Sequence, residues 1–137
     1  MDALALTPIG HVRSPLADPA RAPKQGDEGA PEARLIFGPG FAEGLRDLRA
    51  GEEILVLTWL HRARRDLLSV HPRDDAGAPL RGVFSTRSAD RPNPVGIHRV
   101  TIAEVVSATE LRVLGLEAVD ETPVIDIKPV FDRARER

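Results

Sequence analysis

Prolines and glycines interrupt this chain along its whole length: 12 of its 137 residues are proline and 11 are glycine. Proline removes a backbone donor and ends helices, while glycine is typical of turns. The apolar runs between these interruptions are short and rich in Val, Leu and Ile. This pattern favours short strands over long helices. We expect a mainly all-β fold, a small closed or nearly closed β-barrel with one short helix and long proline-rich loops.

The apolar runs predict where the strands lie. The run 52–61 is so apolar that we expect it to be buried on both faces of its sheet. The run 95–119 divides at Ser-Ala-Thr-Glu into the two strands of a hairpin. The other strands are expected at 8–14, 33–37, 65–72 and 122–131, and the spacing of Phe41, Leu45 and Leu48 predicts the helix over 41–51.

What the chain lacks restricts its chemistry. There is no cysteine, which excludes disulfides, thiolate nucleophiles and cysteine-based zinc sites. The four histidines have no metal-binding spacing, so we expect no metal. Without a signal peptide or an apolar run of about 18 residues, we expect no membrane contact and a cytoplasmic location. One domain is expected over 1–137, with its core at 8–131 and a charged tail at 132–137.

A polar loop stands out between two predicted strands, in the stretch GVFSTRSADRPNPVGIH at 82–98. Pro92 and Pro94 fix φ on both sides of Asn93 and favour extended backbone before each proline. Arg91 and Asn93 are therefore held in place, which suits recognition because little freedom is lost on binding. The alternative is that the arginines bond carbonyls of their own loop.

Two further groups are candidates for chemistry. Asp126 and Lys128 alternate with isoleucines on the last predicted strand, so both side chains are expected on one face. They can orient a nucleophile or hold a nucleoside, or they form a surface ion pair. The cluster HRARR at 61–65 is either a phosphate contact or a solvated turn.

Three blocks of this sequence resemble one family. They are PIGHVRSP at 8–15, GVFSTRSADRPNPVGI at 82–97 and DETPVIDIKP at 120–129. In this order they resemble the TsaA-like (TrmO-type) S-adenosylmethionine-dependent methyltransferases, whose blocks read IG-x-[IV]-RSP, GVFATRS…RPNPIG and D-x-TPV-[IV]-DIKPY. The resemblance covers about 8–131, and the central block is long enough to make chance matching an unsatisfactory explanation.

The resemblance implies a β-barrel enzyme that works as a homodimer. The family's reaction methylates the N6 nitrogen of threonylcarbamoyladenosine beside the anticodon of tRNA. Carried onto matching positions, it implies S-adenosylmethionine contacts from the arm after the first strand, the end of the apolar strand, the central block and the late turn. These residues are Pro23, Lys24, Gln25, His61, Arg62, Arg87, Ile97, His98, Asp120, Glu121, Thr122 and Pro123.

The chemistry of such a reaction suggests roles for the other candidates. Methyl transfer from a sulfonium is an in-line displacement, so alignment can supply most of the catalysis. The acceptor nitrogen must also lose a proton, and a base helps this step. Asp126 is our candidate base and Lys128 its orienting partner. Arg91 and Asn93 would then face the acceptor substrate or brace the loop.

Several positions differ from the family pattern. Lys24 replaces a frequent arginine, Glu121 the usual glycine, His98 a common serine and Val130 the final tyrosine. These differences, with a net charge of −2, leave two alternatives to a tRNA methyltransferase. One is the same cofactor chemistry on a small-molecule acceptor. The other is a non-catalytic module that binds S-adenosylmethionine or RNA.

Overall fold

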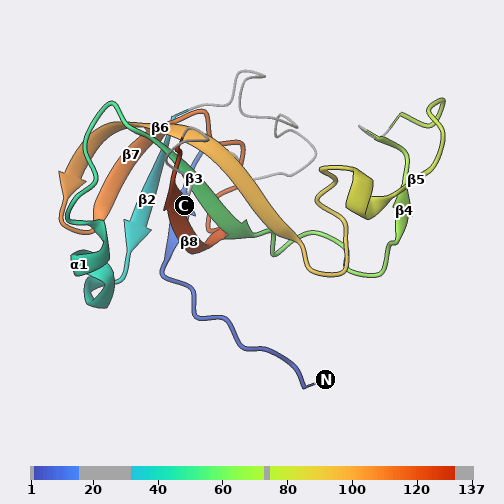
Figure 1. Ribbon diagram of the computed structural model, residues 1–137, viewed down its shortest axis with the longest axis horizontal. Helices are drawn as coiled ribbons and strands as arrows, with labels where there is room; N and C mark the ends of the chain where they lie inside the picture. Colours follow the sequence, from blue (N-terminus) through green and yellow to red (C-terminus); the bar gives the residue numbers. More distant parts are fainter. Residues whose placement is uncertain (1, 16–31, 73–74, 132–137) are drawn as a thin grey trace.

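The computed structural model describes residues 2–15, 32–72 and 75–131. Six strands form a closed antiparallel barrel in the order β1-β2-β7-β6-β3-β8 (Figure 1), which confirms the expected all-β fold. A separate two-stranded sheet pairs β4 with β5. The barrel strands are β1 (Gly10–Arg13), β2 (Ala33–Phe37), β3 (Glu53–Trp59), β6 (Val95–Ser107), β7 (Glu110–Leu114) and β8 (Pro123–Pro129).

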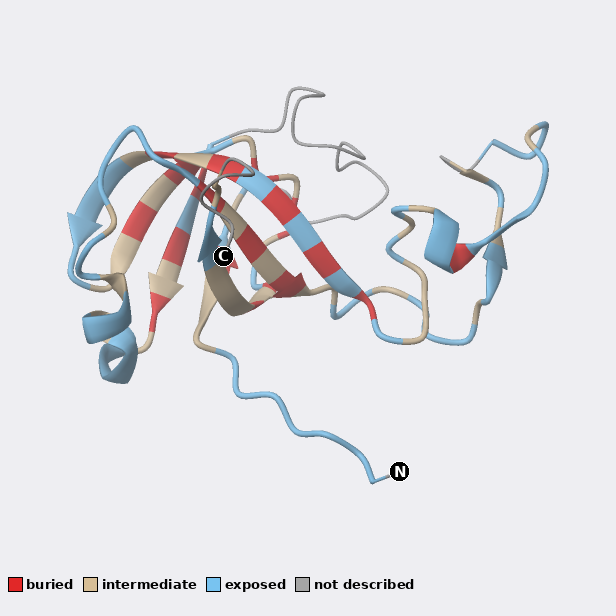
Figure 2. Cartoon of the chain, viewed as in Figure 1, coloured by how far each residue is buried: buried red, intermediate tan, exposed pale blue. Residues whose placement is uncertain are grey.

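The barrel interior is filled from one side of each strand. In β3, Ile54, Val56 and Thr58 are buried while the residues between them are partly exposed. Figure 2 shows the same alternation along β6. The expectation that 52–61 is buried on both faces is therefore wrong, because the outer face of β3 is a surface of the barrel. The core consists of residues such as Val12, Leu35, Ile54, Val56, Val100, Ile102, Leu111, Val113, Leu116 and Val124.

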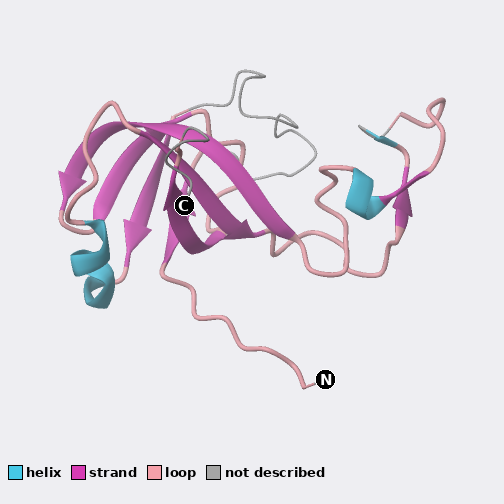
Figure 3. Ribbon diagram, in the orientation of Figure 1, coloured by secondary structure: helices cyan, strands magenta, loops and turns pink. Residues whose placement is uncertain are grey.

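The helix is shorter than its apolar spacing suggests. A 3-10 turn, η3 (Pro39–Phe41), leads into α1 (Ala42–Leu45), drawn in cyan in Figure 3. Gly44 lies inside α1, where glycine lowers helix stability. Leu45 and Leu48 still pack against the barrel core. The spacing thus identified two of the three packing residues, since Phe41 is 37% exposed, and it overestimated the length of the helix.

The hairpin between β6 and β7 is confirmed. Its turn lies at residues 108–109, within the predicted Ser-Ala-Thr-Glu segment. Two register shifts in the ladder interrupt the pairing of these strands, and such irregularities bend a strand. β6 continues past the end of β7, since the pairing stops at Thr101 opposite Leu114. The first half of β6 therefore pairs with β3 and not with β7.

The segment between β3 and β6 leaves the barrel. β4 (Ser69–Val70) pairs with β5 (Arg81–Gly82), and η5 (Val83–Ser85) follows. Both edges of β3 are already occupied by β6 and β8, so the strand expected over 65–72 finds no place in the barrel and is only two residues long. Figure 1 shows this hairpin projecting from the barrel. We term residues 67–72 and 75–85 the projecting arm.

Four strand ends meet at one end of the barrel. β3 is antiparallel to β6 and β8, and β1 is antiparallel to β8. The ends of β1 and β3 therefore lie beside the starts of β6 and β8. In register, Trp59 opposes Val95 and Thr58 opposes Val124. We term this the site end, because the segments that carry the predicted cofactor residues adjoin it.

The helices of the described segments are all short. Among residues 2–15, 32–72 and 75–131, none has the length and apolar character of a membrane-spanning helix.

Candidate active site

The loops that follow β3 and precede β6 are bonded to each other beyond the strand pair. Leu60 N donates to Pro94 O at 2.8 Å, and Arg91 N donates to Arg64 O at 3.0 Å. Arg64 N donates to Asp90 Oδ1 at 2.8 Å. These contacts hold the basic cluster at 61–65 against the polar loop. Two regions singled out separately in the sequence are thus one structural unit.

Arg65 fastens this unit, a role that the sequence did not reveal. Its guanidinium lies 5.0 Å from the centroid of the Trp59 ring, a cation–π arrangement. Its Nε donates to Pro92 O at 2.7 Å and its Nη2 to Asn93 Oδ1 at 3.1 Å. The side-chain oxygen of Asn93 is therefore engaged within the protein. The one available signal was a basic cluster close to the single tryptophan.

The neighbouring Arg64 is also paired. Its Nε and Nη2 donate to the two carboxylate oxygens of Asp66 at 3.0 and 2.8 Å. These hydrogen bonds, together with the positive charge of Arg64, lower the pKa of Asp66 below its ordinary value. The Arg64 backbone and the Arg65 side chain thus hold the loops together, and the Arg64 guanidinium is neutralised by Asp66 of its own segment.

Arg91 braces its own loop. Its Nη1 donates to the carbonyl oxygens of Thr86 and Ser88 at 3.1 and 2.8 Å, and its Nη2 donates to Val83 O at 2.9 Å. This geometry agrees with the second of the two roles considered from the sequence. Arg87, four residues earlier, is exposed and makes no hydrogen bond or ion pair with any described residue. The loop therefore presents Arg87 on a backbone that Arg91 holds.

The turn before β8 is fixed to the end of β1. Glu121 N donates to Val12 O at 2.7 Å, and Asp120 Oδ1 accepts from Ser14 N at 2.9 Å. The buried Thr122 hydroxyl donates to Val119 O at 2.8 Å. Glu121 has a φ of 69°, in the left-handed region that favours glycine. The turn is thus rigid, and the Glu121 side chain points to an exposed position.

A hydrogen-bonded chain lies inside the site end. His98 Nε2 is 2.7 Å from Thr58 Oγ1, and His98 Nδ1 is 2.7 Å from Glu117 Oε1. Thr58 and His98 are buried, and the Glu117 side chain is mostly buried. Both ring nitrogens of His98 are therefore engaged inside the barrel. The neighbouring Ile97 is 43% exposed and offers an apolar side chain at the surface.

Asp126 and Lys128 share the outer face of β8, as the alternation predicted. Lys128 Nζ lies 3.3 Å from Asp126 Oδ2, and the two side chains are 59% and 48% exposed. Asp126 Oδ1 also accepts from Ile127 N at 2.9 Å. Across the sheet Asp126 opposes Leu57, which in turn opposes Ile97. The ion pair thus lies one strand away from Ile97 on the barrel surface.

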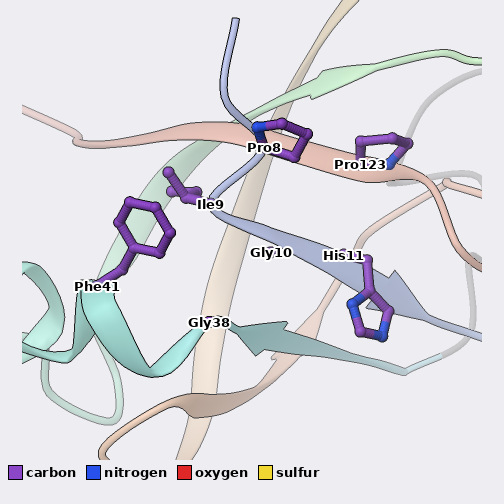
Figure 4. A pocket seen from close by; sticks show the side chains of 7 residues that line it. All are labelled: Pro8, Ile9, Gly10, His11, Gly38, Phe41 and Pro123. Carbon is purple, nitrogen blue, oxygen red and sulfur yellow. The ribbon is translucent and has the colours of Figure 1, made fainter.

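An open hollow of about 370 Å³ lies at the start of β1 (Figure 4). Its lining is mainly apolar, with the His11 imidazole at one side. Pro123, the first residue of β8, contributes to it. The complete lining is Pro8, Ile9, Gly10, His11, Gly38, Phe41 and Pro123.

Comparison with known families now decides the relationship. The model of the tRNA-methyltransferase O N-terminal domain matches residues 11–135. The chain belongs to this family. The family resemblance seen in the three sequence blocks is thereby confirmed.

Several relatives of this chain are named as proteins that bind S-adenosylmethionine. A probable S-adenosyl-L-methionine-binding protein of Methanothermobacter thermautotrophicus is 42% identical over 129 residues, covering 94% of this chain and 91% of its own. An S-adenosyl-L-methionine-binding protein of Archaeoglobus fulgidus is 41% identical over 125 residues, covering 91% of this chain and 88% of its own. The expected cofactor, S-adenosylmethionine, is confirmed by these relatives.

A solved structure of the family has the same fold. The crystal structure of TrmO from Pseudomonas aeruginosa superposes with a TM-score of 0.75 at 30% identity. The alignment covers 99% of this chain and 60% of that one. This family member therefore spans about three fifths of the length of the Pseudomonas aeruginosa chain.

The fold of this family member brings most of the expected cofactor segments together. His61 and Arg62 follow β3, Ile97 and His98 lie near the start of β6, and 120–123 run from the preceding turn into the first residue of β8, all at the site end. Arg87 lies in the braced loop after η5. Pro23, Lys24 and Gln25 lie outside the described residues. Within the described segments, no group of three or more His, Asp or Glu side chains is arranged to hold a metal ion.

Two departures from the family pattern have structural consequences. His98, where serine is common in the family, supplies the imidazole of the buried chain. Glu121, where glycine is usual, is held at positive φ. Val130 follows β8 and is partly buried, while Lys24 lies outside the described residues.

Proposed function

We propose that this chain is an S-adenosylmethionine-dependent methyltransferase whose acceptor is the N6 nitrogen of threonylcarbamoyladenosine next to the tRNA anticodon. One observation carries the proposal. Segments 61–62, 97–98 and 120–123, which match the cofactor segments of the family, converge at the site end. The family description as a tRNA methyltransferase supports the acceptor.

The side chains at the site end suit the cofactor. S-adenosylmethionine supplies a methyl group on a positively charged sulfonium sulfur. The exposed Ile97 offers apolar contact to a nucleoside base, and the exposed Glu121 offers a carboxylate to a positive charge. Arg87, on its braced loop, offers a cation to a carboxylate. We propose that Pro23, Lys24, Gln25, His61, Arg62, His98, Asp120, Thr122 and Pro123 complete the site.

For the transfer itself we propose a base on β8. The acceptor nitrogen gains the methyl group and loses its proton, and Asp126 takes that proton while Lys128 holds the carboxylate at 3.3 Å. An Asp126→Asn variant is expected to lose about 10²–10⁴-fold in turnover with little change in S-adenosylmethionine affinity. Single-turnover kinetics and calorimetry measure the two effects separately. Full turnover in the variant would remove Asp126 from this role.

Nucleoside mass spectrometry of tRNA tests the acceptor directly. A strain deleted for the gene is expected to lose N6-methylated threonylcarbamoyladenosine, and the wild-type gene is expected to restore it. A gene carrying Asp126→Asn serves as the matched control and should restore little. If the modified nucleoside is unchanged in the deletion strain, the tRNA role is wrong.

The same measurements separate the two alternatives. Cofactor binding by calorimetry with unchanged tRNA nucleosides indicates methyl transfer to a small molecule or a non-catalytic binding module. Conversion of S-adenosylmethionine to S-adenosylhomocysteine in the presence of a cell extract freed of RNA distinguishes these two. The relatives named for binding alone are the reason to make this distinction.

We further propose that the chain works in the cytoplasm as a homodimer. The support for self-association is the projecting arm, on which three large apolar side chains are exposed. Leu68, Leu80 and Phe84 are 65%, 62% and 77% exposed. Apolar side chains gathered on a protruding segment are typical of an interface. A partner protomer that covers the arm would remove them from water, while tRNA substrates place the enzyme in the cytoplasm.

A further inference from the structure

The buried chain of Thr58, His98 and Glu117 links the three segments that converge at the site end. Thr58 on β3 comes three residues before His61, and His98 directly follows Ile97. Glu117 comes three residues before Asp120. Each hydrogen bond therefore joins His98 to a residue three positions before another cofactor segment, at a distance of 2.7 Å in both cases.

The chemistry of the carboxylate fixes the direction of one of these hydrogen bonds. An ionised Glu117 carboxylate can only accept, so His98 Nδ1 carries the proton and donates to Oε1. In the tautomer that carries its one proton on Nδ1, Nε2 accepts from the Thr58 hydroxyl. Every polar atom of the ring is satisfied, as burial requires. Among the described residues, no buried side-chain nitrogen or oxygen is without a partner.

Gly96, which has no side chain, leaves the space that the Thr58–His98 hydrogen bond occupies. A Cβ atom at position 96 would lie 2.4 Å from Thr58 Oγ1 and 2.7 Å from His98 Nε2. Real Cβ atoms do not approach other atoms this closely. Gly96 opposes Thr58 across the β3–β6 pair. A side chain at position 96 would therefore occupy the space of the Thr58–His98 hydrogen bond. A glycine, a hydroxyl and an imidazole are thus matched to one another here.

We propose that Thr58, His98 and Glu117 are positioning residues for the S-adenosylmethionine site, with His98 neutral and protonated at Nδ1. The inference rests on the proposed function, because it takes the three linked segments to be the cofactor site. The two hydrogen bonds among these side chains set the spacing between the end of β3, the start of β6 and the turn at 120–123. Such spacing matters because binding and transfer both depend on alignment within a fraction of an ångström.

Two substitutions at Thr58 separate this role from simple packing. Thr58→Val keeps the side-chain volume and removes the hydroxyl, which leaves His98 Nε2 as a buried acceptor without a donor. Thr58→Ser keeps the hydroxyl and removes a methyl group from the core. We expect Thr58→Val to raise the Kd for S-adenosylmethionine about 10-fold, and Thr58→Ser to leave it within about 2-fold of wild type.

The readouts are calorimetric titration with S-adenosylmethionine and thermal unfolding of the same samples. A packing role alone predicts that affinity falls in step with stability for both variants, and this result would overturn the proposal. Equal Kd values for wild type and Thr58→Val, each fully folded, would overturn it as well. A wild-type protein that binds the cofactor but leaves tRNA unmethylated refutes the proposed acceptor and not this inference.

Glu117 supplies a second test if Thr58→Val fails to fold. The Glu117 side chain is 14% exposed, so Glu117→Ala leaves no sealed cavity. Nitrogen-15 NMR of the His98 ring is expected to show Nδ1–H in the wild type and a shift toward Nε2–H in Glu117→Ala, with weaker cofactor binding. Glu117→Gln retains an acceptor oxygen and should stay close to wild type. An Nε2–H ring in the wild type would contradict the proposed chain.

Discussion

At the scale of single residues, Glu121 shows a local conflict between conformation and residue type. It is the non-glycine residue with positive φ in the described part of the chain, at 69°. The conformation is imposed from outside, because Glu121 N bonds Val12 O and Asp120 bonds Ser14 N. A side chain in the left-handed region costs roughly 1–2 kcal/mol. The carboxylate at this position is therefore retained against a backbone cost.

Replacing Glu121 by glycine should make the protein more stable. Glycine relieves the left-handed strain but loses more entropy on folding, for a net gain of about 0.5–1 kcal/mol. The free energy of unfolding in urea measures the change. Glu121→Ala is the matched control, since it removes the carboxylate and keeps the strain, and it should show no such gain. If the carboxylate contacts the sulfonium, both variants should bind S-adenosylmethionine more weakly to a similar extent. Equal stability of the glycine and alanine variants would contradict the strain.

At the scale of elements, the loop from η5 to β6 is a small structure held by Arg91. Three carbonyl oxygens converge on one guanidinium, and Arg65 ties the proline segment to Trp59. Loops ordered by this many contacts keep their shape without a ligand. Arg87 is therefore presented from a preformed loop.

An Arg91→Met substitution should loosen this loop while leaving the barrel folded. Methionine fills similar space but leaves the carbonyls of Thr86 and Ser88 without their donor, while Val83 O keeps the backbone and hydroxyl donors of Thr86. Hydrogen exchange of amides in 83–94 is expected to rise about 10-fold, with core amides such as that of Val56 unchanged. Arg13→Met, an exposed substitution on β1, is the control. Unchanged exchange in the loop would show that the prolines alone keep it rigid.

The elements also show what the sequence allows one to predict. β2 coincides with the expected strand at 33–37. Its apolar residues Ala33, Leu35 and Phe37 alternate along the sequence, and all three are buried in the barrel. The β6–β7 hairpin follows from its turn residues in the same way. The length of α1 and the pairing of β4 depended on competition among elements, such as the occupied edges of β3. In the site, Thr58 pairs with His98 across 40 positions, and Arg65 reaches Asn93 across 28. A local sequence pattern does not indicate which distant residues will be in contact, so these hydrogen bonds could not be predicted from the sequence.

At the scale of the whole molecule, the closed barrel and the projecting arm differ in how far their apolar side chains are buried. The barrel pairs each of its strands on both sides and encloses one core. The arm has two strands of two residues each, too few for an independent hydrophobic core. Its apolar residues Leu68, Leu80 and Phe84 lie in water in the single chain. In the proposed homodimer a second copy of the chain would cover them and thereby stabilise the arm.

Self-association through the arm makes a specific prediction for Phe84. Burying this side chain in an interface is worth about 2 kcal/mol, and a symmetric dimer contains it twice, so Phe84→Ser should raise the dimer Kd roughly 10³-fold. Light scattering coupled to size exclusion, over a range of concentrations, measures this shift. Leu4→Ser is the matched control, because Leu4 is 86% exposed and lies outside the arm, and it should leave the Kd unchanged. A monomeric wild type at all concentrations, or equal dimerisation of the two variants, would rule out the arm as a contact between two copies of this chain.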